Sequence, residues 1–126
     1  MRFRLQPAFL MSCQSGATAV EFALIAPILF ALIIGGLATG LVVYSAAGLH
    51  DAVEQAARCY SVNASKCSTP AQAQSYAKSV YYGLNTPTFT ASIQACGHQV
   101  AASVTMQLTA IITDLGVPLT ATACFP

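Results

Sequence analysis

Glu21 is an unusual residue in this sequence because a long run without charge follows it, from Phe22 to Tyr44. A carboxylate is costly to place in apolar surroundings unless it is paired. Cleavage of the chain after Gly16 would give Ala17 a free α-amine, four residues before Glu21. In a helix, the amine and the carboxylate would lie on one face and could neutralise each other, within one chain or between neighbours. This first explanation of Glu21 would make Gly16 and Ala17 a processing site.

A second explanation of Glu21 is local to the helix end. Thr18 and Glu21 have the T-x-x-E spacing of a capping box, with Thr18 as the N-cap and Glu21 at position N3. A carboxylate in the first turn also interacts favourably with the helix dipole, by about 0.3–1 kcal/mol. This explanation predicts that the helix begins at Thr18.

The other titratable residues do not form a catalytic pattern. His50 and Glu54 are four residues apart and could both reach a metal ion, but two such ligands on an exposed helix are more often a solvated pair. The cysteines show no C-x-x-C spacing, and no glycine-rich phosphate loop or nucleophile motif is present. A net charge of +1 does not indicate a basic surface of the kind that binds nucleic acid. We therefore expect no enzyme activity, no metal, no cofactor and no nucleic-acid partner.

The composition indicates that much of the chain is not in contact with water. Hydrophobic residues make up 56% of the sequence and charged residues only 7%. A helix over the 23 uncharged positions from Phe22 to Tyr44 would be about 34 Å long and could cross a hydrocarbon core of about 30 Å. Arg2 and Arg4 precede this run, and the next positive charge is Arg58. This bias predicts that the N-terminus is cytoplasmic and that the C-terminal part lies outside.

A different use of the apolar run remains open. Small residues follow it, in the order Tyr44-Ser45-Ala46-Ala47-Gly48, so that a signal peptidase could cut after Ala47 and release the rest of the chain. The run is longer than the apolar region of about 7–15 residues in a secretory signal. Its length therefore favours a permanent membrane helix over residues 17–47.

The pattern after the apolar run predicts an α+β domain over residues 48–126. Apolar residues recur at helical spacing from Leu49 to Tyr60, so that the membrane helix should continue as an amphipathic helix to about Tyr60. Thr69 as N-cap and Pro70 at the first position predict a second helix. Gly83 suits the end of this second helix.

Three strands should follow, over residues 88–95, 99–109 and 116–124, where Thr and Val are frequent and polar and apolar residues alternate. Their short links predict a small antiparallel three-stranded β-meander. Cys96-Gly97 is the expected first turn, and residues 111–116 are the second connection. Pro118 predicts that the last strand lies at an edge of the sheet.

The cysteines are expected to cross-link this domain through disulfides. Cys13 precedes the membrane helix, whereas the other four follow it, in an oxidising compartment where three pairings are possible. A meander brings Cys96 near Cys124, and Cys59 and Cys67 flank one short loop. We therefore predict disulfides Cys59–Cys67 and Cys96–Cys124, which stabilise the domain by about 2.5 and 3.5 kcal/mol in the chain-entropy model.

The N-terminal motif resembles a known family. The motif reads Gly16-Ala17-Thr18-Ala19-Val20-Glu21-Phe22-Ala23-Leu24 and is followed by Ala26-Pro27. It resembles the start of TadE/TadF-like pseudopilins of the Tad (tight adherence) pilus, which are similar to type IV prepilins. Two further segments are similar to that family, Glu54-Gln55-Ala56-Ala57-Arg58 and the closing Cys124-Phe125-Pro126. The resemblance is expected to cover nearly the whole chain.

The resemblance implies a minor pseudopilin with a leader over residues 1–16, which a prepilin peptidase removes between Gly16 and Ala17. It implies that Glu21 and Phe22 act in assembly, with other pilins or pseudopilins and the inner-membrane assembly platform of the Tad system as partners, beside membrane lipid. The expected location is the bacterial inner membrane, with the C-terminal domain in the periplasm or in the pilus. The alternative is a bitopic membrane-anchored protein whose outer domain binds a ligand or partner.

Overall fold

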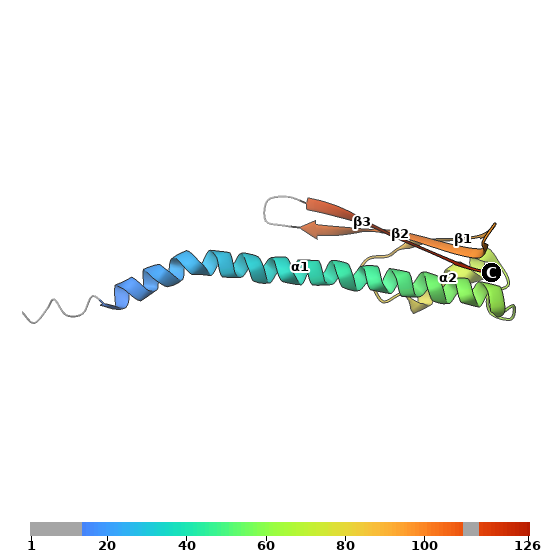
Figure 1. Ribbon diagram of the computed structural model, residues 1–126, viewed down its shortest axis with the longest axis horizontal. Helices are drawn as coiled ribbons and strands as arrows, with labels where there is room; N and C mark the ends of the chain where they lie inside the picture. Colours follow the sequence, from blue (N-terminus) through green and yellow to red (C-terminus); the bar gives the residue numbers. More distant parts are fainter. Residues whose placement is uncertain (1–13, 110–113) are drawn as a thin grey trace, which may run out of the picture. The chain divides into compact units, whose positions relative to one another are not determined.

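The computed structural model describes the backbone of residues 14–109 and 114–126. Two helices precede three strands (Figure 1): α1 Gln14–Val62, α2 Pro70–Val80, β1 Thr88–Gln94, β2 Gly97–Thr109 and β3 Asp114–Phe125. The predicted α+β order of elements is therefore confirmed. Of the predicted leader, residues 1–13 lie outside the described part of the chain, and so does Cys13.

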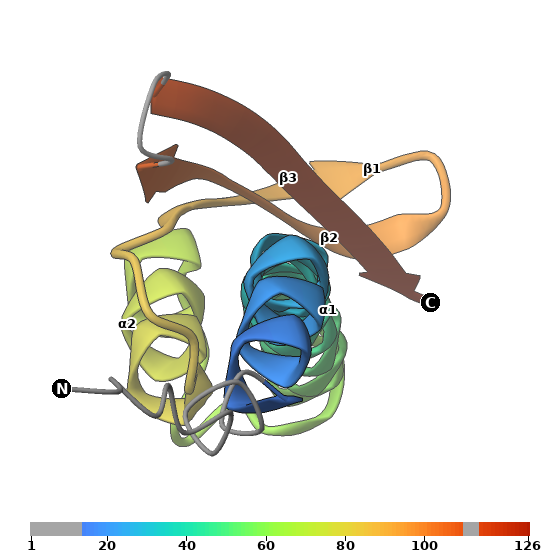
Figure 2. The same ribbon diagram turned by 90° about the vertical axis from the view of Figure 1, so that its left-hand side faces the viewer.

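The chain divides into two compact units, one that extends to Leu37 and one that extends from Ala38 to Pro126. In the second unit, the later part of α1 and all of α2 lie side by side on one face of the sheet (Figure 2). The sheet is antiparallel in the order β1-β2-β3, which is the predicted meander. The second unit is therefore a two-layer domain with two helices packed on three strands.

Small side chains dominate the contact between these layers. Leu49, Val53 and Val100 are the large apolar residues that are completely buried with them. The alanines of this core come from both helices and from β2 and β3: Ala52, Ala56, Ala57, Ala77, Ala102 and Ala121. Alanine lets backbones approach closely, so the core is thin and gains little apolar area per residue.

The ends of the two helices follow local signals. α1 stops at Val62, two residues beyond the predicted end, where Asn63 still donates its N–H to the Cys59 carbonyl at 2.9 Å. Thr69 is the N-cap of α2, as predicted, because its side chain accepts the N–H of Gln72 at 3.3 Å. Pro70 occupies the first position, where its missing N–H costs nothing.

The prediction that Gly83 ends α2 is wrong. The helix stops at Val80, and Tyr81 already has an extended backbone as the C-cap. Gly83 is not in the left-handed conformation, since Gly97 is the described glycine with a positive φ. Instead, a Cβ at Gly83 would overlap the ring and hydroxyl of Tyr81. The glycine is needed for the space that it leaves, which sequence spacing does not reveal.

The strands lie close to their predicted positions, with shifts of one or two residues at their ends. Gln94 pairs with Gly97, so the first turn consists of Ala95 and Cys96 and begins one residue before the predicted turn. β3 starts at Asp114, within the predicted second connection, of which residues 111–113 are outside the described part. Pro118 lies in β3, which pairs with β2 on one side only, as expected of an edge strand.

Both predicted disulfides are present. Cys59–Cys67 closes a loop of sequence separation 8 and ties the end of α1 to the following loop. Cys96–Cys124 has a separation of 28 and joins the first turn to the end of β3. Near these disulfides, the Ser61 hydroxyl donates a hydrogen bond to the carbonyl of Pro126 at 2.6 Å. The C-terminus is thereby held against the end of α1.

Aromatic residues gather where α1 meets the connection between α2 and β1. Tyr44 and Tyr82 have ring centroids 5.5 Å apart, and Tyr81 packs edge-on against Phe89 at 6.3 Å. The hydroxyls of Ser45 and Tyr81 are buried, and neither makes a hydrogen bond of good geometry within the described part of the chain. Burial raises the pKa of the Tyr81 hydroxyl, the nearby Ser45 hydroxyl partly offsets this, and Tyr44 adds to it.

We expect Gly97→Ala to lower the free energy of unfolding by more than about 1 kcal/mol, because Gly97 has φ +118° and a Cβ there would overlap the Phe125 carbonyl oxygen. Gly116→Ala is the matched control, since its Cβ would lie 3.4 Å from the Thr105 methyl, an ordinary contact. Urea denaturation of the oxidised chain in detergent measures both. Equal stability of the two variants would contradict this account of Gly97.

We expect Tyr81→Phe to remove part of the alkaline instability of the domain. Because the folded-state pKa of Tyr81 is raised, its contribution is fully present below the unfolded value of about 10 and is lost as pH rises through the folded value. The unchanged protein should therefore lose more stability than the variant between about pH 9 and pH 11, measured by thermal unfolding. Parallel losses in both proteins would show that Tyr81 does not titrate with unfolding.

Candidate assembly surface on the N-terminal helix

The first half of α1 presents apolar side chains on all sides. Between Val20 and Val43, its large hydrophobic residues are 45–70% exposed, apart from the partly buried Val42. Within the described residues, α1 is the helix that is long and apolar enough to cross a membrane, and none of its most apolar stretch is buried. A core helix of a soluble protein would instead bury such a stretch. α1 therefore contains a candidate membrane span, as predicted.

Glu21 is the one charged side chain on the described part of α1 before Asp51. It is exposed in this single chain, and its neighbour Phe22 is 66% exposed. No ion pair of Glu21 is found among the described residues. The carboxylate and the apolar ring beside it are thus both available to something outside the chain.

The capping-box explanation is wrong for the unprocessed chain. α1 begins at Gln14, four residues before Thr18, and has no acidic residue in its first turn. The N–H groups of residues 18–21 can therefore bond to the carbonyls of residues 14–17 and do not need the side chains of Thr18 and Glu21. Gln14 to Ala17 contain no proline that would stop the helix, so the capping pattern lies inside it.

Gly16 has no packing reason to be glycine in this chain. It lies exposed on α1, and a Cβ there would meet no atom within 4 Å. Its backbone is helical and does not have a positive φ. Ala17 follows in the helix, with a side chain outside the described part. Packing within the described part of the chain therefore does not explain the glycine at this position.

Gly36 and Gly40 form a second pattern on α1, within the apolar run. They have the G-x-x-x-G spacing within the apolar run, which places two glycines on one helix face and lets a second helix approach closely. A Cβ at either position would meet no atom within 4 Å, so neither glycine serves packing within this chain. This spacing is visible in the sequence and is typical of a face on which two membrane helices pack.

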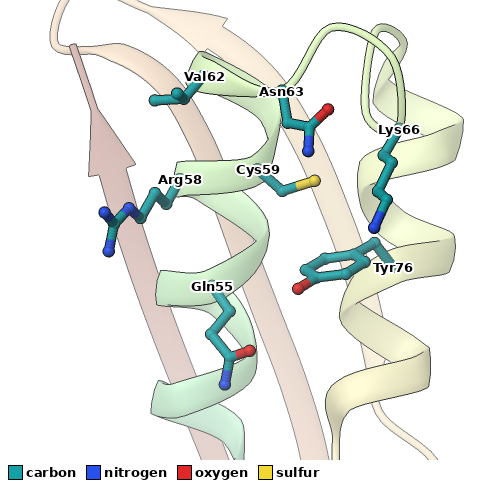
Figure 3. A pocket seen from close by; sticks show the side chains of 7 residues that line it. All are labelled: Gln55, Arg58, Cys59, Val62, Asn63, Lys66 and Tyr76. Carbon is teal, nitrogen blue, oxygen red and sulfur yellow. The ribbon is translucent and has the colours of Figure 1, made fainter.

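The folded unit also has a surface hollow of about 370 Å³ beside the Cys59–Cys67 disulfide (Figure 3). Figure 3 shows Arg58 and Lys66 on opposite sides of it, with Tyr76 between the end of α1 and α2. Its lining has no carboxylate or histidine, and Cys59 is in a disulfide. Within the described residues, no group of three or more His, Cys, Asp or Glu could hold a metal ion. His50 and Glu54 are both exposed.

Comparisons with known proteins give one finding. Comparison with curated proteins and with solved structures gave no match. Residues 16–58 match the family model described as TadE-like protein.

The match begins at Gly16 and ends at Arg58, so it contains the N-terminal motif and the second similar segment. The closing Cys124-Phe125-Pro126 lies outside the match, which covers 43 of the 126 residues. Over residues 16–58 this chain is therefore similar to TadE-like proteins, as its motif around Glu21 predicted.

Proposed function

We propose that this protein is a minor pseudopilin of a Tad-type pilus, with a structural and not a catalytic role in pilus biogenesis, adherence or secretion. The observation that carries the proposal is the TadE-like match over an uncovered apolar helix with one carboxylate near its start. A helix of this kind needs lipid before assembly and needs other helices after it. Other pilins or pseudopilins and the inner-membrane assembly platform would supply those contacts.

Processing between Gly16 and Ala17 would change the surroundings of Glu21. The cut removes the first residues of α1, so that the new helix starts at Ala17 and Glu21 lies four residues from its end. The new α-amine and the carboxylate then share one face. Either the same chain or a neighbour can provide this pairing, which offsets the cost of bringing Glu21 into an apolar filament core.

The location that fits this role is the bacterial inner membrane, with a cytoplasmic N-terminus and the folded domain in the periplasm. Arg2 and Arg4 precede the span, which favours this orientation. Cys59–Cys67 and Cys96–Cys124 support it, because disulfides persist in oxidising compartments. Gly36 and Gly40 would let neighbouring helices approach within the membrane or the filament.

Two other functions differ from this one in the size of the mature protein. A bitopic anchored protein, for which the hollow beside Tyr76 is a candidate partner site, would keep all its residues. A secreted domain would be released by a cut after Ala47. That cut falls inside α1 and separates the domain from Tyr44, whose ring packs at a tilt against Tyr82, and from the buried Ser45. The intact mass of the protein from its own membrane distinguishes the three outcomes.

The first prediction concerns processing. The unchanged protein should lack residues 1–16 in its mature form, whereas Gly16→Val should remain full length and membrane-bound, with assembly lost. Because a Cβ at Gly16 meets nothing in the chain, the variant should fold normally and obstruct only the peptidase. Gly36→Val, at an equally open position in the apolar run, should be processed normally. A mature protein that retains residues 1–16 would refute the proposal.

The second prediction concerns Glu21. Glu21→Gln removes the charge that would pair with the amine of Ala17 and lowers the cost of placing the side chain in lipid. The variant should insert and be processed but should not co-purify with its pilin partners. Glu54→Gln changes an exposed acid on the same helix beyond the apolar run and should assemble normally. Normal pilus formation by Glu21→Gln would show that the carboxylate is not needed for packing.

A further inference from the structure

Charge in the folded unit is concentrated near the end of α1. The sequence has only five Lys or Arg and four Asp or Glu, and four of these nine residues fall within residues 51–66: Asp51, Glu54, Arg58 and Lys66. Asp51 accepts a hydrogen bond from the Gln55 amide at 3.0 Å. Within the described part of the chain, none of the four forms an ion pair, although Glu54 and Arg58 have the four-residue spacing that favours one on a helix. Their charges are therefore available to a partner.

These charges line two hollows on opposite sides of α1. The acidic hollow, of about 510 Å³, lies between α1 and the end of β3, and Asp51 and Glu54 line it. The basic hollow is the one of about 370 Å³ beside Tyr76, where Lys66 is found and no carboxylate (Figure 3). Arg58 lines both hollows. Figure 2 shows α2 and the C-terminal end of β3 on the two sides of α1.

The basic hollow presents hydrogen-bond donors to a group that enters it. Asn63 accepts from the Ser65 hydroxyl through its Oδ1 at 2.7 Å, which leaves its amide N–H groups for a ligand. Figure 3 shows the Lys66 side chain directed toward Tyr76. Ammonium, guanidinium and amide N–H groups together suit a carboxylate.

We propose that the acidic hollow of one copy of this chain docks against the basic hollow of a neighbouring copy, so that Asp51 and Glu54 face the neighbour's Lys66. This inference rests on the proposed function, in which neighbouring subunits have the same orientation. A second copy is the occupant because the chain carries both halves of the contact, and neither half is paired within it. When copies stand side by side with one orientation, hollows on opposite sides of α1 meet as acid against base.

The proposed contact is open-ended. Its two halves differ, so each copy that docks leaves one acidic and one basic hollow free at the ends of the assembly. Asp51 and Glu54 precede Arg58 by seven and four residues, which is about 10 Å and about 6 Å along α1. A neighbour that brings its Arg58 level with these acids must be displaced along the helix by such a distance. Rotation combined with displacement produces a helical filament and not a closed ring.

The charges would select the neighbour and its register more than they strengthen the assembly. An exposed ion pair contributes little because water and salt screen it, whereas complementary charges disfavour wrong partners and fix how two surfaces meet. Packing of the uncovered apolar side chains of α1 would supply the remaining affinity. Neutralising one carboxylate, as in Glu54→Gln, leaves Asp51 for the contact, so a test has to detect the contact itself or reverse a charge.

A carbodiimide, which joins a carboxylate to an amine in contact with it, detects this pairing directly. Unlabelled and isotope-labelled full chains are mixed in phosphatidylcholine vesicles and cross-linked, and the linked peptides are identified by mass spectrometry. We expect mixed-isotope peptides that join Lys66 to Asp51 or Glu54. Lys78 is the matched control, because it is equally exposed but lies outside both hollows, and it should not be joined to these acids.

A charge exchange separates the contact from general attraction between oppositely charged chains. In a mixture of Asp51→Lys and Lys66→Glu, the new amine and the new carboxylate should join position 51 of one chain to position 66 of the other. Lys78→Glu has the same net charge as Lys66→Glu. In its mixture with Asp51→Lys, the link between positions 51 and 78 should be weaker by at least about tenfold.

Three results would overturn the contact: links of Lys66 only within one isotope, no links of Lys66 to either acid, or equal yields in the two mixtures. In the native membrane, links from Lys66 to a different protein alone would assign the basic hollow to that protein and would refute the second copy as the occupant. Processing at Gly16 does not depend on this contact. A chain that is cut there but gives no Lys66 links would therefore refute the contact and leave the proposed function standing.

Discussion

Apolar side chains surround the first half of α1, and the folded domain does not cover them. Lipid or other helices must therefore shield these side chains from water, and the rest of the structure depends on this constraint. Between Val20 and Val43 the large side chains remain exposed on every face, whereas from Leu49 to Tyr60 the apolar residues are confined to the face beneath the sheet. One continuous helix, with Pro27 in its interior, thus lies in two environments. The change of pattern along it, and not a break in its backbone, marks where lipid or partner helices end and the domain begins.

The domain that the helix carries is stabilised by few but well-placed interactions. Its core is built largely from alanine, which contributes little apolar area for each residue buried. The two disulfides add stability that this thin core does not supply, since they cross-link one end of the sheet and the end of α1 and reduce the entropy of the unfolded chain. Small domains of this size commonly need such cross-links. The sparse charge of the sequence is therefore consistent with its fold, because neither the span nor the core has use for charge.

The sequence predicted most of the fold because its signals were local. Thr69 and Pro70 define the start of α2 through contacts within one turn, and alternation of polar residues defines three strands whose order then brings Cys96 near Cys124. The failures required tertiary information. Gly83 leaves the space that the Tyr81 side chain occupies. Helical residues precede Thr18, so Thr18 lies inside α1 and is not its N-cap. The motif that contains Gly16 and Glu21 predicted the similarity to TadE-like proteins, whereas the roles of these two residues remain predictions. The spacing of Gly36 and Gly40 is a further local signal in the sequence.

Pro118 has a consequence for how copies of this domain can associate. The Thr105 carbonyl accepts from Asn85 on the β1 side of the sheet, and Thr105 is the register partner of Pro118. In an antiparallel ladder, the N and carbonyl of Pro118 must then face the open edge of β3. A strand that approached this edge would meet a missing donor in the middle of its ladder, which discourages sheet extension from subunit to subunit. Among the described elements, the apolar part of α1, which the domain leaves uncovered, therefore offers a better surface for association than this strand edge.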